Sequence, residues 1–233
     1  MDTVTAGAGR RAALVPEPSP EQLRHRQRDE REGPSAADDL VVVLRLRGVL
    51  DPEALTAAWR DVLERHPVLR SVYPGPAAEA HVLPAVAVAR VRRRPVAPGT
   101  GEDVVARVLA APADLAGEGP ARATLLRVAP EEHLLVLAVH RIAIDDRSVR
   151  PLLADLAEAY SARRAGRRPL FTAVPAFAAW AEGRGGPAVV PPREQCTGPV
   201  PPAGTRRIVV ERSLADAVAA RLAALRAQAG EPP

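Results

Sequence analysis

The sequence predicts a mixed α/β (α+β) domain in which helices pack on a sheet as a two-layer sandwich. The run 134–139 is apolar on both strand faces, which indicates a central strand covered by other elements. A second apolar run at 121–128 precedes it, and the short connection at 129–132 predicts a hairpin. Stretches with helical periodicity flank this hairpin at 51–66 and 148–164. Strands alternating with amphipathic helices are typical of α/β folds.

The other elements follow from helix caps, turn residues and alternation. Ser19 followed by Pro20 is a typical helix start, Gly48 ends a strand, and Pro67 ends a helix that Asp51 caps. The expected strands are 40–47, 68–73, 86–91, 121–128, 133–139 and 206–211. The expected helices are one beginning at Ser19, then 51–66, 102–111, 148–164, 175–180 and 214–229.

Composition shifts along the chain predict four segments. Residues 1–18 show no periodicity and are expected to form a flexible N-terminus. Residues 19–182 contain most of the periodic elements and form the main folded unit. Residues 183–204 are rich in Gly and Pro, which predicts a linker. Residues 205–233 then read as the start of a second unit that is truncated, and the chain has no internal repeats.

The charge pattern argues against nucleic-acid binding. The formal net charge is +4 and the pI is near 10.3, but charges of both signs are interspersed and aromatic residues make up only 3%. All 32 basic residues are Arg, and neither Lys nor Asn occurs. This usage indicates a GC-rich genome, so the high pI reflects Arg usage more than a basic face.

Other site classes lack the residues they need. Cys196 has no cysteine partner and no neighbouring histidine, so it is expected to be a bystander thiol. The histidines do not have metal-ligand spacing, and no Gly-rich phosphate loop follows a strand, so we expect no metal and no cofactor. No apolar run approaches the roughly 18 residues of a membrane span, and no signal-peptide core is present. We therefore expect no membrane partner and a cytoplasmic location.

The candidate functional residues lie where the central strand ends and the 148–164 helix begins. Polar residues are placed there at His140, Arg141, Asp145, Asp146 and Ser148. The ends of buried strands are where α/β folds usually place their chemistry. An imidazole can accept a proton near neutral pH, whereas a guanidinium has no acceptor nitrogen. A charged guanidinium at this point must reach water or a carboxylate, and Asp145 and Asp146 are the nearest candidates.

The run 140–146 resembles the His-His-x-x-x-Asp-Gly active-site motif of condensation domains in nonribosomal peptide synthetases. Here Arg141 stands at the second His position and Asp146 at the Gly position. In the family, the second His is the catalytic base, so the resemblance implies that this base is lost. The altered form His-Arg-x-x-x-Asp-Asp is similar to the X-domain of glycopeptide synthetases, a non-catalytic relative that recruits cytochrome P450 crosslinking enzymes.

Three further segments resemble family motifs in the same order. The segment 19–24 is similar to the opening Ser-x-x-Gln-x-Arg motif, and 65–73 to Arg-His-Glu-x-Leu-Arg-Thr-x-Phe. The segment 176–180 is similar to a later Phe-Ala-x-Trp motif without its Tyr and Asp. The residues expected to play structural roles are Ser19, Gln22, Arg65, His66, Arg70, Ser148 and Trp180. The resemblance implies a chloramphenicol-acetyltransferase-like lobe followed by the start of a second lobe.

The resemblance leaves several functions open. The first is a non-catalytic module of peptide-antibiotic biosynthesis that holds a cytochrome P450 beside a peptidyl carrier protein bearing a phosphopantetheine-bound peptide. The alternatives are an amide-forming condensation enzyme, an inactive truncated remnant of one, or a fragment whose fold a second chain completes. His140 is expected to be structural, and Asp145 is expected to hold the loop through an ion pair. The 148–164 helix, with Arg150, Arg163 and Arg164 outward, is a candidate docking face.

Overall fold

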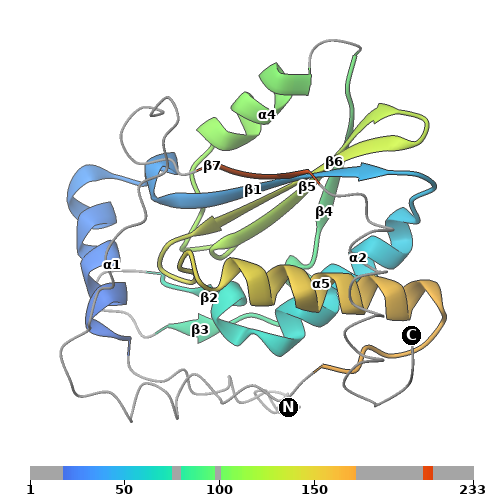
Figure 1. Ribbon diagram of the computed structural model, residues 1–233. Coiled ribbons are helices and arrows are strands. Elements are labelled where there is room, and N and C mark those ends of the chain that lie inside the picture. The colour runs from blue at the N-terminus through green and yellow to red at the C-terminus, as the bar shows by residue number, and fades with distance from the viewer. Residues whose placement is uncertain (1–17, 75–79, 98–100, 172–206, 212–233) are drawn as a thin grey trace, which may run out of the picture.

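The computed structural model describes residues 18–74, 80–97, 101–171 and 207–211. A five-stranded sheet in the order β4-β5-β6-β1-β7 forms its centre (Figure 1). The helices are α1 (Pro20–Glu32), α2 (Pro52–Arg65), α3 (Ala85–Val88), α4 (Gly101–Ala110) and α5 (Val149–Arg164), with 3₁₀ turns η1 (Ala36–Asp38) and η2 (Pro67–Arg70). The strands are β1 (Asp39–Arg47), β2 (Ser71–Val72), β3 (His81–Val82), β4 (Val91–Pro95), β5 (Ala121–Ala129), β6 (Glu132–His140) and β7 (Arg207–Glu211).

The strand β6 lies at the centre of the sheet, as its apolar run predicts. It pairs antiparallel with β5 and with β1, and its last residue, His140, lies opposite Asp39. The predicted hairpin at 121–139 is confirmed as β5 and β6. The outer strands β4 and β7 pair parallel with β5 and β1. His140 is therefore at the end of the most covered strand, beside the start of β1.

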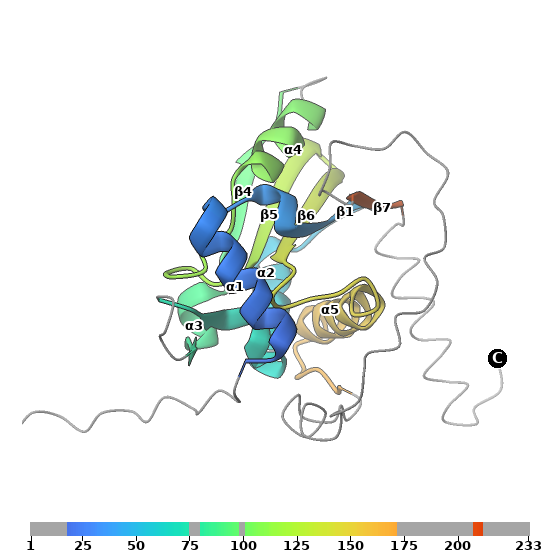
Figure 2. The ribbon, with the colours of Figure 1, turned by 90° about the vertical axis from the view of Figure 1, so that its left-hand side faces the viewer.

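Helices lie over both faces of this sheet (Figure 2). On one face, α2 and α5 form the larger core, in which Trp59 and Tyr160 are each 1% exposed. On the other face, α4 contributes Val105 to a smaller cluster with Val136 and Ala138. The predicted α/β class is confirmed, and α4 adds partial cover to the second face.

The predicted caps form. Ser19 accepts the backbone N–H of Gln22, and the Gln22 amide oxygen accepts the N–H of Ser19, so the pair is a reciprocal capping box. Asp51 accepts the N–H groups of the first turn of α2. Gly166, with φ of 67°, follows α5 in the left-handed region that glycine tolerates best. These ends depend on local residue identity, which explains why the sequence predicts them.

Two predicted strands are wrong in part. The range 68–73 contains the 3₁₀ turn η2 before the two-residue strand β2, because Pro67 fixes a turn and the Arg70 side chain holds it by donating to two backbone carbonyls. The first half of the range 86–91 belongs to the short helix α3, and β4 begins only at Val91. The alternation of Ala and Val is the reason that a strand was predicted here. In the structure, Ala85 begins a helical turn and packs into the core.

Several expectations fall on residues outside the described ranges. These are the N-terminus at 1–17, the 175–180 helix with Trp180, the linker at 183–204 and the 214–229 helix. The expected strand at 206–211 is present as β7, parallel to β1 in the same sheet. The proposed domain boundary at 205 remains a prediction. Among the described residues, no helix has both the length and the apolar character needed to cross a bilayer.

Candidate functional site

The candidate site lies where β6 ends and α5 begins. We call residues 141–148 the motif loop. Its position is fixed from three directions: the Arg141 N–H donates to the Asp38 carbonyl over 2.8 Å, and the His140 N–H donates to the Pro120 carbonyl over 2.9 Å. From α1, the Gln22 side-chain amide donates to the Ile142 carbonyl over 3.1 Å. The opening motif residue Gln22 thus joins α1 to the motif loop.

His140 is not arranged as a general base. Its side chain is 2% exposed, and its Nδ1 accepts the backbone N–H of Ile142 over 3.1 Å. A neutral ring has one acceptor nitrogen, so Nε2 carries the remaining proton. The pKa of His140 is lowered to about 4, mainly by burial and also by the nearby His25 and Arg122, while the charge of Asp38 opposes the shift. The ring is consequently neutral at pH 7, with its one lone pair already used by the backbone.

Asp29 and Asp38 offer carboxylate oxygens within 4.8 Å of a His140 ring nitrogen, and Asp39 pairs with His140 across the sheet. We call Asp29, Asp38, Asp39 and His140 the buried cluster. Asp29 Oδ2 lies 3.6 Å from His140 Nε2, which is too long for a good hydrogen bond. Burial raises the pKa of Asp29 and of Asp39 to about 6, and the charge of Asp38 raises both. The adjacent guanidinium of Arg28 or Arg122 opposes each shift.

The cluster does not fit a resident metal as it is arranged. Asp29, Asp38 and His140 each offer a ligand atom, and these atoms lie within 4.8 Å of one another. A metal ligand needs a free lone pair, however, and the His140 lone pair accepts the Ile142 N–H while Nε2 is protonated. Asp38 and Asp39 already bind Arg28 and Arg122. The cluster is better described as a charged junction at which α1, η1, β1 and β6 meet.

Arg141 reaches the surface of the motif loop. Its guanidinium lies 3.7 Å from the carboxylate of Asp146, and the two side chains are 28% and 40% exposed. Asp145 instead accepts the backbone N–H and the hydroxyl of Ser148, over 2.8 and 2.5 Å. The described partner of Arg141 is therefore Asp146, and Asp145 fixes the turn that leads into α5.

The second family motif holds the helices together. Arg65 and His66, at the end of α2, both donate to Asp155 of α5, over 2.8 and 2.7 Å. Burial opposes ionisation of Asp155, but these two hydrogen bonds outweigh it and lower its pKa. Arg70 donates to the backbone carbonyls of Leu63 and Leu83. These motif residues act on the scaffold, away from the motif loop.

Sequence reasoning did not identify the partners of these residues. Asp155 lies on α5 with no pattern that marks it, and Asp29 is one charge among many on α1. One signal was available for the buried cluster: Asp38 directly precedes the apolar strand β1, and Asp39 is its first residue. Two carboxylates at the entrance of a buried strand predict a charged junction, because buried charges require partners.

The arrangement has limited chemical capacity. Within the described residues, the site contains a buried neutral imidazole, a half-exposed guanidinium and carboxylates bound to arginines. None of these groups presents a basic nitrogen to a substrate amine. At the two His positions of the motif, neither described side chain offers a free imidazole nitrogen to a substrate amine.

Comparisons with known proteins agree on one family. The condensation-domain family model matches residues 20–186. The isonitrile lipopeptide synthase of Mycobacterium tuberculosis is 40% identical over 157 residues, which cover 63% of this chain and 6% of that protein. The non-canonical nonribosomal peptide synthetase CymA of Salinispora arenicola is 38% identical over 173 residues, or 70% of this chain and 2% of that protein.

Solved structures give the same fold. The X-domain in its complex with OxyB from teicoplanin biosynthesis has a TM-score of 0.63 and 40% identity, over 78% of this chain and 40% of that chain. The first condensation domain of the calcium-dependent antibiotic synthetase, at 21% identity, shares the fold with a TM-score of 0.64 over 74% of this chain and 45% of that chain. This chain thus spans less than half of each of these two solved chains.

Proposed function

This chain belongs to the condensation-domain family of nonribosomal peptide synthesis, and from that premise we propose that it is a non-catalytic, X-domain-like module that recruits a cytochrome P450 to a carrier-bound peptide. One observation carries the proposal: neither residue at the two His positions of the motif offers a proton acceptor. Arg141 has no acceptor nitrogen, and the acceptor of His140 is occupied by the Ile142 N–H.

The kind of partner is supported by the X-domain likeness. That neighbour is in complex with OxyB, a P450, and its identity of 40% is well above that of the calcium-dependent antibiotic condensation domain. A carrier protein with its phosphopantetheine-bound peptide is the second partner.

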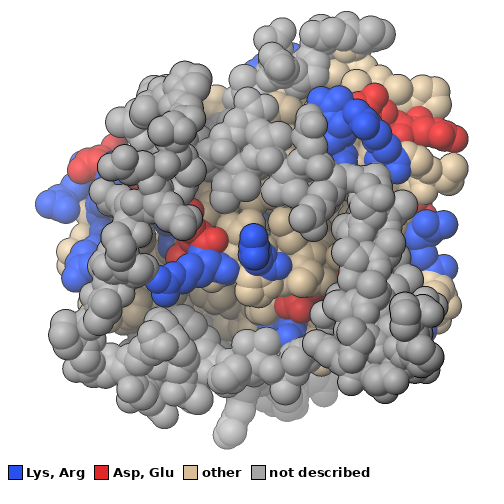
Figure 3. Space-filling view, in the orientation of Figure 1, with Lys and Arg blue, Asp and Glu red and all other residues tan. Residues whose placement is uncertain are grey.

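The contacts of α5 reduce the set of residues on this helix that could dock a partner. Arg163 was expected to point outward, but it is bound to Asp61 of α2 through two hydrogen bonds of 2.6 and 2.5 Å. It therefore holds α2 and α5 together and is not a free docking residue. Arg150 and Arg164 are exposed and remain candidates. On the face shown in Figure 3, acidic and basic residues are interspersed, which favours a specific polar contact over a uniform basic surface.

Calorimetry with OxyB, the P450 in complex with the X-domain neighbour, tests recruitment. We expect saturable binding at low ionic strength that weakens as salt is raised, because guanidinium–carboxylate contacts at exposed positions are screened. Arg150→Glu should weaken binding if α5 is the docking face, and Arg90→Glu is a control away from α5. Lack of binding at low salt, together with binding of loaded carrier protein, would favour the degenerate condensation interpretation.

A second assay separates recruitment from catalysis. Loaded donor and acceptor carrier proteins are incubated with the chain, and mass spectrometry measures the condensed product. We expect no product above the protein-free control. The double variant Arg141→His with Asp146→Gly should form little product, because restoring the motif does not by itself hold the two substrates in a reactive orientation. Product that depends on Arg141 would contradict the non-catalytic assignment.

A further inference from the structure

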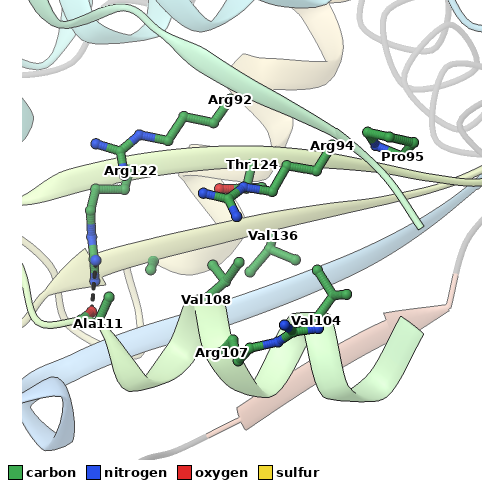
Figure 4. Close-up of a pocket in the computed structure, with 11 residues that line it drawn as sticks. Arg92, Arg94, Pro95, Val104, Arg107, Val108, Ala111, Arg122, Thr124 and Val136 are labelled. Atoms are coloured by element: carbon green, nitrogen blue, oxygen red, sulfur yellow. Dashed lines mark hydrogen bonds between the residues drawn. The ribbon is translucent and has the colours of Figure 1, made fainter. Parts of the chain in front are cut away.

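A cavity of about 290 Å³ lies on the sheet face that α4 covers, away from the motif loop. Figure 4 shows it between α4 and the strands β4, β5 and β6. Its lining combines guanidinium groups with small apolar side chains. The residues are Arg92, Arg94, Pro95, Val104, Arg107, Val108, Ala111, Arg122, Thr124, Val136 and Ala138.

The charge of this cavity is of one sign. Four arginines from three elements line it: Arg92 and Arg94 from β4, Arg107 from α4 and Arg122 from β5. Asp and Glu are absent from the lining residues. Like charges that converge on a partly enclosed space repel one another, so such an arrangement favours an anion.

The four arginines differ in how firmly they are held. Arg122 donates to the backbone carbonyls of Ala111 and Pro112 and pairs with the buried carboxylate of Asp39, so it is structural. Arg92 pairs with Glu118 over 2.7 Å, but both side chains are about half exposed, and such surface pairs exchange easily. Arg94 is exposed and forms no ion pair within the described part of the chain. Of these three arginines, Arg94 is the one whose guanidinium is most available to a ligand.

Part of the cavity lining is apolar. Val104 and Val108 come from α4, and Val136 and Ala138 come from β6 at the opposite wall. Thr124, which is 4% exposed, lies on the strand between the arginines and this wall. Pockets of this kind bind organic ligands, with the apolar wall supplying contact area and a few polar groups fixing orientation.

From these observations we propose that the cavity binds a small organic phosphate, with the phosphate between Arg92 and Arg94 and the organic part against the α4 and β6 side chains. A phosphate group offers three acceptor oxygens and can satisfy guanidinium groups from two positions at once. A carboxylate has two oxygens and one charge, so it matches a single guanidinium fork better. The cavity thus favours phosphate over carboxylate.

Phenyl phosphate is a suitable probe because its ring tests the apolar wall and its phosphate tests the arginines. Calorimetry on the full chain at low salt should show one site per chain. Inorganic phosphate should bind more weakly because it leaves the apolar wall uncovered. Benzoate should bind at least about tenfold more weakly, the loss expected when one charge-assisted contact is missing.

The strand β4 provides a matched pair of variants. Arg94→Gln should weaken phenyl phosphate binding at least about tenfold. Arg93→Gln is the control, because Arg93 lies on the opposite side of the same strand and binds Glu53 over 2.9 Å and the Pro52 carbonyl over 3.0 Å. This control should leave binding unchanged. Thermal melts of both variants are used to check that each is folded.

Two results would overturn the assignment: no saturable phenyl phosphate binding by the folded wild-type chain, or equal binding by Arg94→Gln and wild type. Benzoate affinity equal to that of phenyl phosphate would also contradict a phosphate site. The measurement uses neither a P450 nor a carrier protein, so its outcome is independent of the recruitment proposal.

Discussion

Replacing Asp155 by Asn tests whether the second family motif stabilises the lobe. The carboxylate accepts from Arg65 and His66, and the three side chains are only 14–25% exposed. Asn keeps the shape but removes the charge. A charge-assisted hydrogen bond contributes about 1.5–3 kcal/mol and a neutral one about 0.5–1.5, so two weakened bonds cost about 2 kcal/mol. For a chain of this size that lowers Tm by roughly 4–8 °C.

Urea unfolding at pH 7 measures this loss, and pH dependence adds a second test. The pKa of Asp155 is lowered from 3.8 in the folded state, so its contribution is fully present above pH 3.8 and is lost as pH falls through the folded value. The difference between Asp155→Asn and wild type should therefore shrink in acid. Glu32→Gln, which affects an exposed pair with Arg28, is a control expected to change stability by less than about 0.5 kcal/mol. A loss at pH 7 no larger than this control refutes the reasoning.

Three further changes concern the candidate site. The pKa of Asp29 is raised to about 6, so its contribution to stability is lost as pH rises from about 4 to 6. Asp29→Asn should lack this loss. In urea unfolding at pH 4.5 and 7.5, the variant should be about 1 kcal/mol more stable than wild type at the higher pH. Equal pH slopes would contradict this. Asp145→Ala should lose about 1 kcal/mol in thermal melts, because Ser148 loses its acceptor. Arg141→Ala should change stability by less than about 0.5 kcal/mol, and a larger loss would show a stronger ion pair than the 3.7 Å contact.

The structure confirms expectations that depended on residue type and periodicity. The apolar run of β6 predicts a central strand, and it is the third of five. Ser19 and Asp51 cap helices as their sequence positions suggest. By contrast, the range 86–91 alternates Ala and Val, a pattern that suits a strand as well as a buried helical turn. Packing of Ala85 against the larger core decides that case.

At the candidate site, too, some properties follow from the sequence and others do not. Loss of the base at Arg141 follows from the sequence, because no environment gives a guanidinium an acceptor nitrogen. The state of His140 does not follow from the sequence. It depends on burial, on the Ile142 N–H at Nδ1, and on Asp29 and Asp38, which lie more than 100 positions earlier in the chain.

The sequence by itself determined the α/β class, the central strand and the absence of an acceptor nitrogen at position 141, because residue identity and short-range periodicity fix these properties. Only the tertiary structure decided that Asp155 holds both Arg65 and His66, that the buried cluster forms, and that arginines of β4, β5 and α4 line one cavity. Local pattern gives the face on which a side chain lies, but distances between remote segments depend on how the elements pack, and those distances set burial, pKa and ion pairing.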